Sequence, residues 1–414
     1  MKLRKVGAIA GIGVLVLAGC SQGGTSGGKG TINIGIELPQ QGSELAGTQP
    51  VINGIKLAVK DSGGTVGGWK VEIPNSVILD DAKDGVHDPQ TGAQNMQALT
   101  SNQNVVAVIG PQNSSVAKVQ IPISNAAGLL QCSPANTNEG LTKPEFGALD
   151  VRKTNPTTIN YIRVVTTDDY QGPAAARYIL QNLNVKTVYI IDSTDTFGKG
   201  IADNFEKYFK DNGGTIVARD GAPKTTTDYT ALLTAAKSKN PGAIYFGGVT
   251  ADGGARILKT AVQLGLNVPF VGPDGIYDGS AKTKDSFLNL AGDDAKNSFA
   301  TAAAVGDYPG RAEFAAKYKA EYGADPTGYS ATGYSCAQVV LDALKRAGPG
   351  ATDVKDLRTK IRAAAVDPSI TYTSVIGSFK FDANGDTSQK IISFYTFDAA
   401  TQDWAFKEQL DFAK

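Results

Sequence analysis

Short apolar runs alternate with amphipathic stretches along most of the chain. The run at 105–109 is wholly apolar, which is typical of a strand buried inside a parallel sheet. The stretch at 49–61 places Ile52, Ile55 and Val59 on one face of a helix. Because strand-like runs are followed by helical stretches, each helix can serve as the crossover that parallel strands require. The pattern therefore predicts an α/β protein with parallel sheets flanked by helices.

A first alternating series occupies residues 31–132. Its predicted strands are 31–37, 70–79, 105–109 and 129–132. Its predicted helices are 49–61, 89–101 and 114–127, and Asp88-Pro89 supplies the N-cap and first turn of the second. The stretch 133–160 that follows has little periodicity and interrupts the alternation.

A second series begins at Tyr161. The predicted strands are 161–165, 187–192, 215–220, 243–247 and 269–272, and the helices between them are 171–183, 198–212, 228–239 and 251–264. Helices at 311–322, 329–346 and 353–365 and strands at 378–381, 390–397 and 404–410 complete the chain. Both series end in a helix stop, a short apolar strand, a small residue and a proline, at 128–135 and 265–274. This weak repeat predicts two similar lobes whose strand ends face each other across a ligand cleft.

The N-terminus has the pattern of a signal peptide. Lys2, Arg4 and Lys5 precede an apolar stretch at 6–18, and small residues lead to Cys20. Leu17-Ala18-Gly19-Cys20 resembles a bacterial lipobox, which implies removal of residues 1–19 and a lipid on Cys20 that tethers the protein to the outside of a membrane. The alternative is an ordinary secretory signal or a membrane helix, but thirteen apolar residues are short for a span of about 20. Residues 20–30 are rich in Gly and Ser and predict a flexible tether.

Composition excludes several classes of function. The 40 basic and 40 acidic residues balance, and residues 1–19 hold three of the basic ones, so the mature chain carries −3. A nucleic-acid partner would need a strongly basic face, so none is expected. His87 is the single histidine and its turn-forming neighbours predict an exposed loop position. We therefore expect no metal, no cofactor and no catalysis, and we find no credible nucleophile elbow for a hydrolase.

Two cysteines remain once Cys20 carries lipid. Cys132 and Cys336 would lie in a compartment where disulfides persist. The competing interpretation is a pair of buried free thiols, since cysteine packs well as a small hydrophobe. The residues alone leave both alternatives open.

The loops just past the predicted strands carry the candidate chemistry. Ser114 stands at the start of a helix, where its hydroxyl and the first free backbone N–H groups can bind an anion such as a carboxylate. The alternative is a plain helix cap. The candidate loops are 111–115, 133–137, 193–198 and 272–275.

Taken in order and spacing, five stretches resemble the branched-chain amino-acid-binding proteins of ABC transporters, which have the type I periplasmic binding fold. The resemblance runs from about Thr31 to the end of the chain. It implies one lobe from 31–164 plus 302–377 and a second from 165–301 plus 378–414, joined by a hinge of three crossings. It also places Cys132 and Cys336 in one lobe, where they are predicted to pair. The stretches are Ile109-Gly110-Pro111 with Asn113-Ser114-Ser115, Ser133-Pro134-Ala135-Asn136-Thr137, Asp169-Tyr170-Gln171-Gly172-Pro173, Phe197-Gly198-Lys199-Gly200 and Gly272-Pro273-Asp274-Gly275.

The resemblance also assigns ligand-binding roles. Ser114 and Thr137, beside Asn113, would hold the α-carboxylate of an amino acid, and the Ala135 carbonyl would accept from its ammonium group. Asp274 of the second lobe would pair with that ammonium.

Two further positions complete the predicted site, Phe197 over the ligand and Val249 against its side chain. Asp274, Phe197 and Val249 depart from the usual Glu, Tyr and aromatic residue of the leucine-type pattern. A turn aspartate, a core phenylalanine and a loop threonine at Thr137 are the corresponding structural alternatives.

The implied function is an extracytoplasmic solute-binding protein, a monomer that gives a branched-chain or other small apolar amino acid to a membrane permease. One alternative is a ligand without an ammonium group, such as an amide, urea or an aromatic acid. Another is a sensor that reports its ligand to a receptor.

Overall fold

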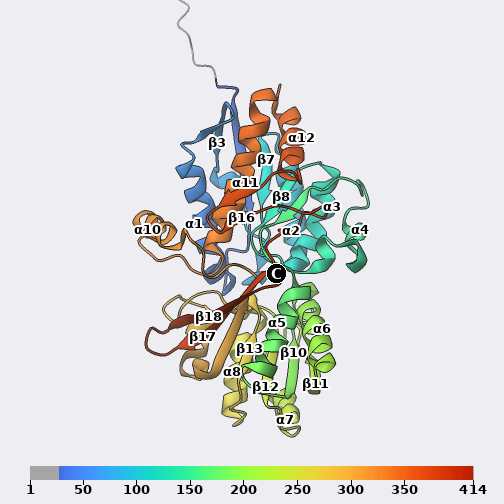
Figure 1. Ribbon diagram of the computed structural model, residues 1–414, viewed down its shortest axis with the longest axis vertical. Coiled ribbons are helices and arrows are strands. Elements are labelled where there is room, and N and C mark those ends of the chain that lie inside the picture. Colours follow the sequence, from blue (N-terminus) through green and yellow to red (C-terminus); the bar gives the residue numbers. More distant parts are fainter. Residues whose placement is uncertain (1–27, 414) are drawn as a thin grey trace, which may run out of the picture.

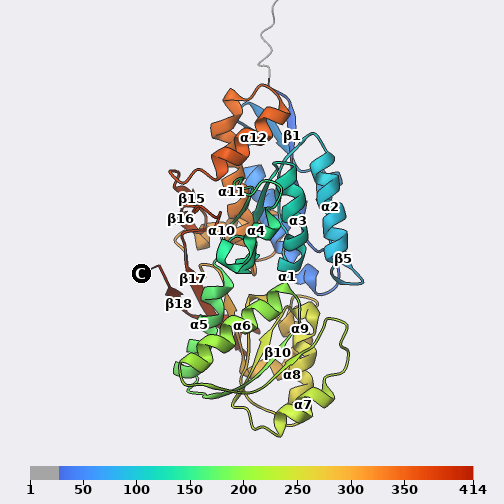
Figure 2. The same cartoon turned by 90° about the vertical axis from the view of Figure 1, so that its right-hand side faces the viewer.

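The computed structural model describes residues 28–413 and has two bodies, one above the other along the long axis (Figures 1 and 2). Each body is a largely parallel sheet with helices on both faces, so the predicted α/β class is confirmed. The signal peptide and Cys20 predicted from the sequence lie outside the described residues.

The sheet of the first body has the order β2-β3-β1-β7-β8-β9, with β4 also paired to β1. All neighbours are parallel except β2 and β3. The wholly apolar β7 has five buried residues in succession, as expected of a parallel strand with helices on both faces. The strands are β1 (Thr31–Glu37), β2 (Thr65–Val66), β3 (Trp69–Glu72), β4 (Ile78–Leu79), β7 (Val105–Ile109), β8 (Leu130–Ser133) and β9 (Tyr161–Arg163).

Helices cover both faces of this sheet. α1 packs on α11 and α11 on α12 at one face, while α2 and α3 pack together at the other. The contact of α1 with α11 requires glycine, because a Cβ at Gly54 would lie 2.3 Å from the carbonyl oxygen of Ser330. The helices are α1 (Glu44–Asp61), α2 (Pro89–Ser101), α3 (Ser114–Ala126), α4 (Ala148–Val151), α10 (Arg311–Tyr322), α11 (Ser330–Ala347) and α12 (Val354–Ala365).

A disulfide joins the sheet of the first body to its helical cover. Cys132 on β8 is bonded to Cys336 on α11, with the two Cα atoms 5.9 Å apart. Both residues are fully buried. The bond ties together segments that are 204 residues apart in the sequence.

The second body has a seven-stranded sheet in the order β11-β10-β12-β13-β14-β17-β18. Its last two pairings, β14 with β17 and β17 with β18, are antiparallel. The strands are β10 (Thr187–Asp192), β11 (Thr215–Gly221), β12 (Ala243–Gly247), β13 (Phe270–Gly272), β14 (Ser298–Ala302), β17 (Ile391–Asp398) and β18 (Asp403–Asp411). The helices are α5 (Asp168–Gln181), α6 (Thr196–Asp211), α7 (Thr230–Lys237), α8 (Gly254–Gln263) and α9 (Phe287–Ala291).

The chain passes between the bodies after β9, after β14 and before β17. A fully buried ion pair links two of these connecting segments. Arg163 Nε, at the end of β9, donates to Oδ1 of Asp386, which precedes β17, at 2.6 Å. Two hairpins stand outside the main sheets, β5 (Ala82–Lys83) with β6 (Val86–His87) and β15 (Tyr372–Ser374) with β16 (Gly377–Phe379). Phe379 and Phe381 pack in the core of the first body.

Several predicted elements differ from the observed ones. The helix predicted at 49–61 begins at Glu44, and Pro50 lies inside it rather than near its start. The strand predicted at 70–79 is divided into β3, a 3₁₀ turn at Asn75–Val77 and β4, because Pro74 cannot donate to the sheet. Neither β14 nor α9 was predicted, and β14 has the sequence Ser-Phe-Ala-Thr-Ala, in which phenylalanine is the single large apolar residue.

Candidate functional site

A small cavity of about 30 Å³ lies between the two bodies, where the carboxyl ends of their strands meet. The residues for which a ligand role was predicted all line this one cavity. Its lining consists of Gln112, Asn113, Ser114, Ala135, Thr137, Phe197, Val249, Asp274 and Gly275.

The first body contributes the N-terminus of α3. Buried β7 ends at Ile109, and Asn113 and Ser114 are the N-cap and the first residue of the 13-residue helix. The first N–H groups of a helix have no partner within it, and they favour a negative charge. Asn113 makes no side-chain cap, and its Oδ1 is buried without a hydrogen-bond partner among the described residues. The free N–H groups suit this wall to a carboxylate, whereas Asn113 Oδ1 is an acceptor and requires a donor.

The loop after β8 completes the first wall. Ser133 Oγ accepts from the backbone N–H groups of Ala135 (3.2 Å) and Asn136 (2.9 Å) and donates to the Pro111 carbonyl (2.9 Å). These bonds fix the loop beside the start of α3. Ala135 and Thr137 are thereby held at the cavity with almost no solvent exposure.

The second body contributes Phe197, Val249 and Asp274. Phe197 is the second residue of α6 and is buried, and Val249 follows β12. Asp274 follows β13 in the turn Pro273-Asp274-Gly275. Gly275 allows close packing in this turn, since a Cβ there would lie 2.4 Å from the Gly248 carbonyl oxygen.

The Asp274 carboxylate is held from both bodies. Gln171 Nε2 on α5 donates to its Oδ1 and Tyr329 OH donates to its Oδ2, each at 2.7 Å. Burial raises the pKa of Asp274 to about 6, although both hydrogen bonds favour its charged form. Sequence reasoning missed Gln171 and Tyr329 as partners, because neither position has a pattern that reveals what its side chain meets.

A second cavity of about 30 Å³ adjoins the first and shares Gln112, Val249, Asp274 and Gly275 with it. Its remaining wall includes Glu44 of α1 and Asp278. Asp278 Oδ1 accepts from the Phe287 N–H at 2.9 Å, and its Oδ2 is buried without a hydrogen-bond partner among the described residues. Burial raises the pKa of Asp278 to about 7. This end of the cleft is therefore acidic.

His87 is not the exposed loop residue that its neighbours predicted. It is 1% exposed, because the β5–β6 hairpin folds against the start of α1. His87 Nδ1 lies 2.6 Å from Glu44 Oε1 in the first body, and Nε2 lies 3.2 Å from Asp195 Oδ2, the N-cap of α6 in the second. Lys224 Nζ of the second body donates to the His87 carbonyl at 2.6 Å. The histidine thus bridges the two bodies.

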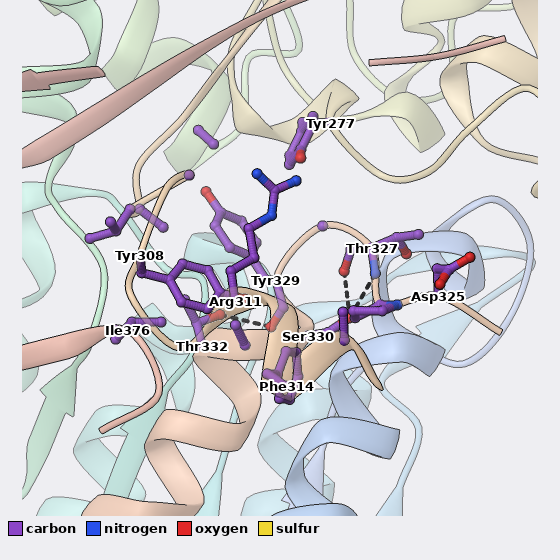
Figure 3. Close-up of a pocket in the computed structure, with 18 of the residues that line it drawn as sticks. Tyr277, Tyr308, Arg311, Phe314, Asp325, Thr327, Tyr329, Ser330, Thr332 and Ile376 are labelled. Carbon is purple, nitrogen blue, oxygen red and sulfur yellow. Dashed lines mark hydrogen bonds between the residues drawn. The ribbon is translucent and has the colours of Figure 1, made fainter. Parts of the chain in front are cut away.

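A larger hollow of about 330 Å³ lies beside the passage after β14 (Figure 3). Tyr277 and Tyr395 of the second body and Arg311 and Phe314 of α10 line it. Tyr329 lies between this hollow and Asp274. It lines the hollow, and its hydroxyl donates a hydrogen bond to the Asp274 carboxylate. None of the predicted ligand residues lines the hollow.

Comparison with known proteins identifies the family. The family model described as "Periplasmic binding protein" matches residues 31–401. The chain belongs to the periplasmic binding protein family. Membership implies a solute-binding protein that acts outside the cytoplasm with a membrane permease, and the family is not one of enzymes.

Individual family members resemble the chain over most of its length. The Leu/Ile/Val-binding protein homolog 2 of Brucella abortus is 27% identical over 381 residues, which cover 91% of this chain and 92% of that protein. The leucine binding protein LivK from Thermotoga maritima has a TM-score of 0.78 at 26% identity, covering 92% of this chain and 99% of that one. LivJ from Streptococcus pneumoniae, a branched-chain amino acid transporter substrate binding protein in complex with isoleucine, has a TM-score of 0.75 at 25% identity, with coverage of 92% and 99%.

Two structural features are absent from residues 28–413. No helix there has the length and apolar character that a membrane span needs. Within the same range, no group of three or more His, Cys, Asp or Glu side chains is placed to hold a metal ion.

Proposed function

We propose that this family member captures a branched-chain amino acid in the interlobe cavity and delivers it to an ABC permease. One observation carries the proposal. The N-terminus of α3 and the Asp274 carboxylate face one cavity from opposite bodies, so that a ligand with both charges satisfies both walls. The ligands named for the similar Brucella, Thermotoga and Streptococcus proteins support the branched-chain class.

Each predicted residue then has a role in holding the ligand. Ser114 and Thr137, with the N–H groups at the start of α3, bind the α-carboxylate, and Asn113 lies beside them. The Ala135 carbonyl and Asp274 accept from the ammonium group. The remaining two, Phe197 and Val249, cover the ligand and contact its side chain.

The two bodies act as lobes that close on the ligand. We place two boundaries near 165 and 302, as the sequence predicts, and the third after Phe381, because Phe379 and Phe381 pack in the first core. A ligand that contacts both lobes at once binds the closed form better than the open one. It therefore shifts the population toward closure.

The lipobox resemblance supports a lipid anchor on Cys20, with residues 20–30 as the tether. Tethered in this way, the monomeric binding protein remains near its permease in the membrane. If the partner were a receptor instead of a permease, closure on the ligand would serve as a signal. A permease gene next to the gene for this protein would favour transport over sensing.

Calorimetry with free and blocked amino acids tests the proposal. Leucine, isoleucine and valine are titrated beside N-acetyl-leucine, which lacks the ammonium group, and leucinamide, which lacks the carboxylate. We expect free amino acids to bind and both blocked forms to lose most of the affinity. Failure of every free amino acid to bind, together with binding of benzoate or an aliphatic amide, would replace the amino-acid assignment with that alternative.

A further inference from the structure

The helix α6 of the second body contacts the first body through one of its faces. Thr196, Gly200 and Asn204 are four residues apart, so they lie on the same side of the helix. At one end of this face, Asn138 Nδ2 of the first body donates to the Thr196 carbonyl at 3.1 Å. At the other end, Asn204 Nδ2 donates to Glu139 Oε1 at 2.9 Å. Gly200 lies between these two hydrogen bonds along the helix.

The two sides of this contact adjoin the ligand cavity. Asn138 directly follows Thr137, which lines the cavity from the first body. Thr196 directly precedes Phe197, which lines it from the second. Neither Asn138 nor Gly200 lines the cavity. The contact therefore forms beside the ligand without touching it, and it exists only while the two lobes are together.

The Asn138 side chain is held in place by the first body. Its Oδ1 accepts from the Gly140 N–H at 3.0 Å, which makes Asn138 the N-cap of the 3₁₀ turn at Glu139–Leu141. Its backbone carbonyl accepts from Arg163 Nη1 at 2.7 Å. Because these partners all belong to the first body, the Nδ2 donor is oriented for α6 before the lobes meet.

Two glycines in α6 lack a side chain for different reasons. Glycine inside a helix is less favourable than alanine, so its presence calls for a contact that a Cβ would obstruct. At Gly198 the obstruction lies within the second body, since a Cβ would be 2.5 Å from the Gly247 carbonyl oxygen. At Gly200 a Cβ would be 2.5 Å from Asn138 Nδ2. Apart from its chain neighbours and the backbone of its own helix, the only described atoms within 4 Å of that Cβ belong to Asn138.

We propose that Asn138 and Gly200 are positioning residues that set how tightly the closed lobes hold the ligand. This inference rests on the proposed function but does not depend on which branched-chain amino acid is bound. The Asn138 amide fits against α6 only where residue 200 has no side chain. This fit brings Thr137 and Phe197 to the ligand from opposite lobes. Weakening the contact destabilises the closed form and leaves the ligand's own contacts unchanged.

Gly200→Ala on the full mature chain tests the inference, by calorimetry and rapid-mixing kinetics with leucine, isoleucine and valine. The added Cβ obstructs closure but not the entry of the ligand into the open cleft. We therefore expect all three amino acids to bind about tenfold more weakly, through faster dissociation with an unchanged association rate. The matched control is Lys199→Ala, which removes an exposed side chain that pairs with Asp203 on the same helix. It is expected to bind as the wild type does.

A double-mutant cycle tests whether the two residues act on each other. Asn138→Ser keeps an oxygen that can accept from the Gly140 N–H, but its side chain is too short to reach residue 200. We expect Gly200→Ala to weaken leucine binding about tenfold in the wild-type background and less than about twofold in the Asn138→Ser background.

The outcomes separate the inference from the proposed function. The same loss in both backgrounds, or no loss in either, would overturn the inference, while leucine binding by the wild type leaves the proposed function standing. If the wild-type protein binds none of the three amino acids, the proposed function itself is rejected.

Discussion

At the scale of single residues, the cavity contains a buried carboxylate, Asp274, for which we propose a cationic partner on the ligand. Asp274 is 8% exposed and accepts hydrogen bonds from Gln171 and Tyr329, yet burial still raises its pKa to about 6. An ammonium ligand stabilises the ionised form and lowers this pKa. We therefore expect binding of an amino acid to be linked to deprotonation of Asp274.

The first prediction concerns the charge at Asp274. Removing one partner of a buried charge pair costs about 3–5 kcal/mol, so Asp274→Ala is expected to weaken amino-acid binding by about 100- to 1,000-fold. In the wild type, affinity is expected to be full above about pH 6 and to fall as the pH drops below it, because the carboxyl proton must then be displaced. Calorimetric titration between pH 4.5 and 8 checks both effects. Unchanged affinity in Asp274→Ala would contradict the proposed role.

Which residues line the cavity could be predicted only where the path of the main chain brings a residue to it. The seven predicted ligand residues follow buried strands or begin helices, so the topology brings them to one cavity. Tyr329 and Gln171 reach Asp274 through side chains from distant elements, and nothing local indicates their target. His87 was predicted wrongly for the same reason, since its turn-like neighbours do not show that α1 covers it.

At the scale of elements, the β5–β6 hairpin connects the lobes at the side of the cleft away from β17 (Figure 2). His87 on this hairpin faces Glu44 of α1 and Asp195 of α6, while Asp252 and Asp81 are further carboxylates nearby. Burial alone would lower the pKa of His87, but the charge of Glu44 and the bond to Asp195 outweigh it and raise the pKa well above 6.5. The protonated ring therefore stabilises the closed arrangement.

The second prediction is a pH dependence that arises from His87. Because its pKa is raised in the folded closed form, the stabilisation is fully present below about pH 6.5 and is lost as the pH rises through the folded pKa. His87→Gln, which cannot take the proton, is expected to be less stable at pH 6 and to flatten this alkaline decline. Thermal unfolding of both proteins from pH 6 to 10 measures the difference. If the melting temperatures of the two proteins change with pH in the same way, the charge of His87 does not stabilise the contact between the lobes.

The third prediction concerns the disulfide between β8 and α11. Free-thiol titration of denatured, unreduced mature protein is expected to find Cys132 and Cys336 unreactive. Replacing both cysteines by alanine removes a cross-link between segments 204 residues apart, so the unfolded chain gains conformational freedom. The change is expected to lower the free energy of unfolding by about 2–5 kcal/mol. Denaturant unfolding checks the loss. Two reactive thiols in the untreated wild type would contradict the prediction.

Elements with a clear period were predicted well, and those set by tertiary contacts were not. β1, β7, β10, β12 and α2 have the predicted bounds, since each has a buried run or a capped start such as Asp88 before Pro89. β14 was not predicted because its short sequence has one large apolar residue, Phe299, and its pairing with β13 and β17 makes it a strand. The helix α1 begins at Glu44, before Pro50, and Glu44 contacts His87 of the β5–β6 hairpin, a tertiary contact that the local pattern does not reveal.

At the scale of the whole molecule, the alternation of strands and helices predicted two lobes, and the structure has two sheets of that kind. The closed arrangement could not be predicted, because it depends on contacts between side chains of different lobes. Asn204 Nδ2 of α6, for example, donates to Glu139 Oε1 of the first body at 2.9 Å. Such contacts form only after both lobes have folded.

The fourth prediction concerns the attachment of the molecule to a membrane. Two or more acyl chains hold a protein stably on a bilayer, at about 0.8 kcal/mol for each buried CH₂. Cys20→Ser is therefore expected to move the protein from the membrane fraction to the soluble fraction. Fractionation of cells and the mass of the N-terminal peptide check this. A wild-type chain that is soluble and has no lipid mass on Cys20 would contradict the anchor.

The buried pair of Arg163 and Asp386 has a mechanical consequence. Arg163 ends β9 and Asp386 precedes β17, so the pair fastens two of the three connecting segments to each other. The Arg163 N–H also donates to the Gly385 carbonyl at 3.1 Å, and Arg163 Nη1 donates to the Asn138 carbonyl at 2.7 Å. Because these bonds hold the two segments together, we expect the segments to move as one unit. We therefore expect the proposed opening to be a rotation about one axis, which returns the two walls of the cavity to the same relative position each time the lobes close.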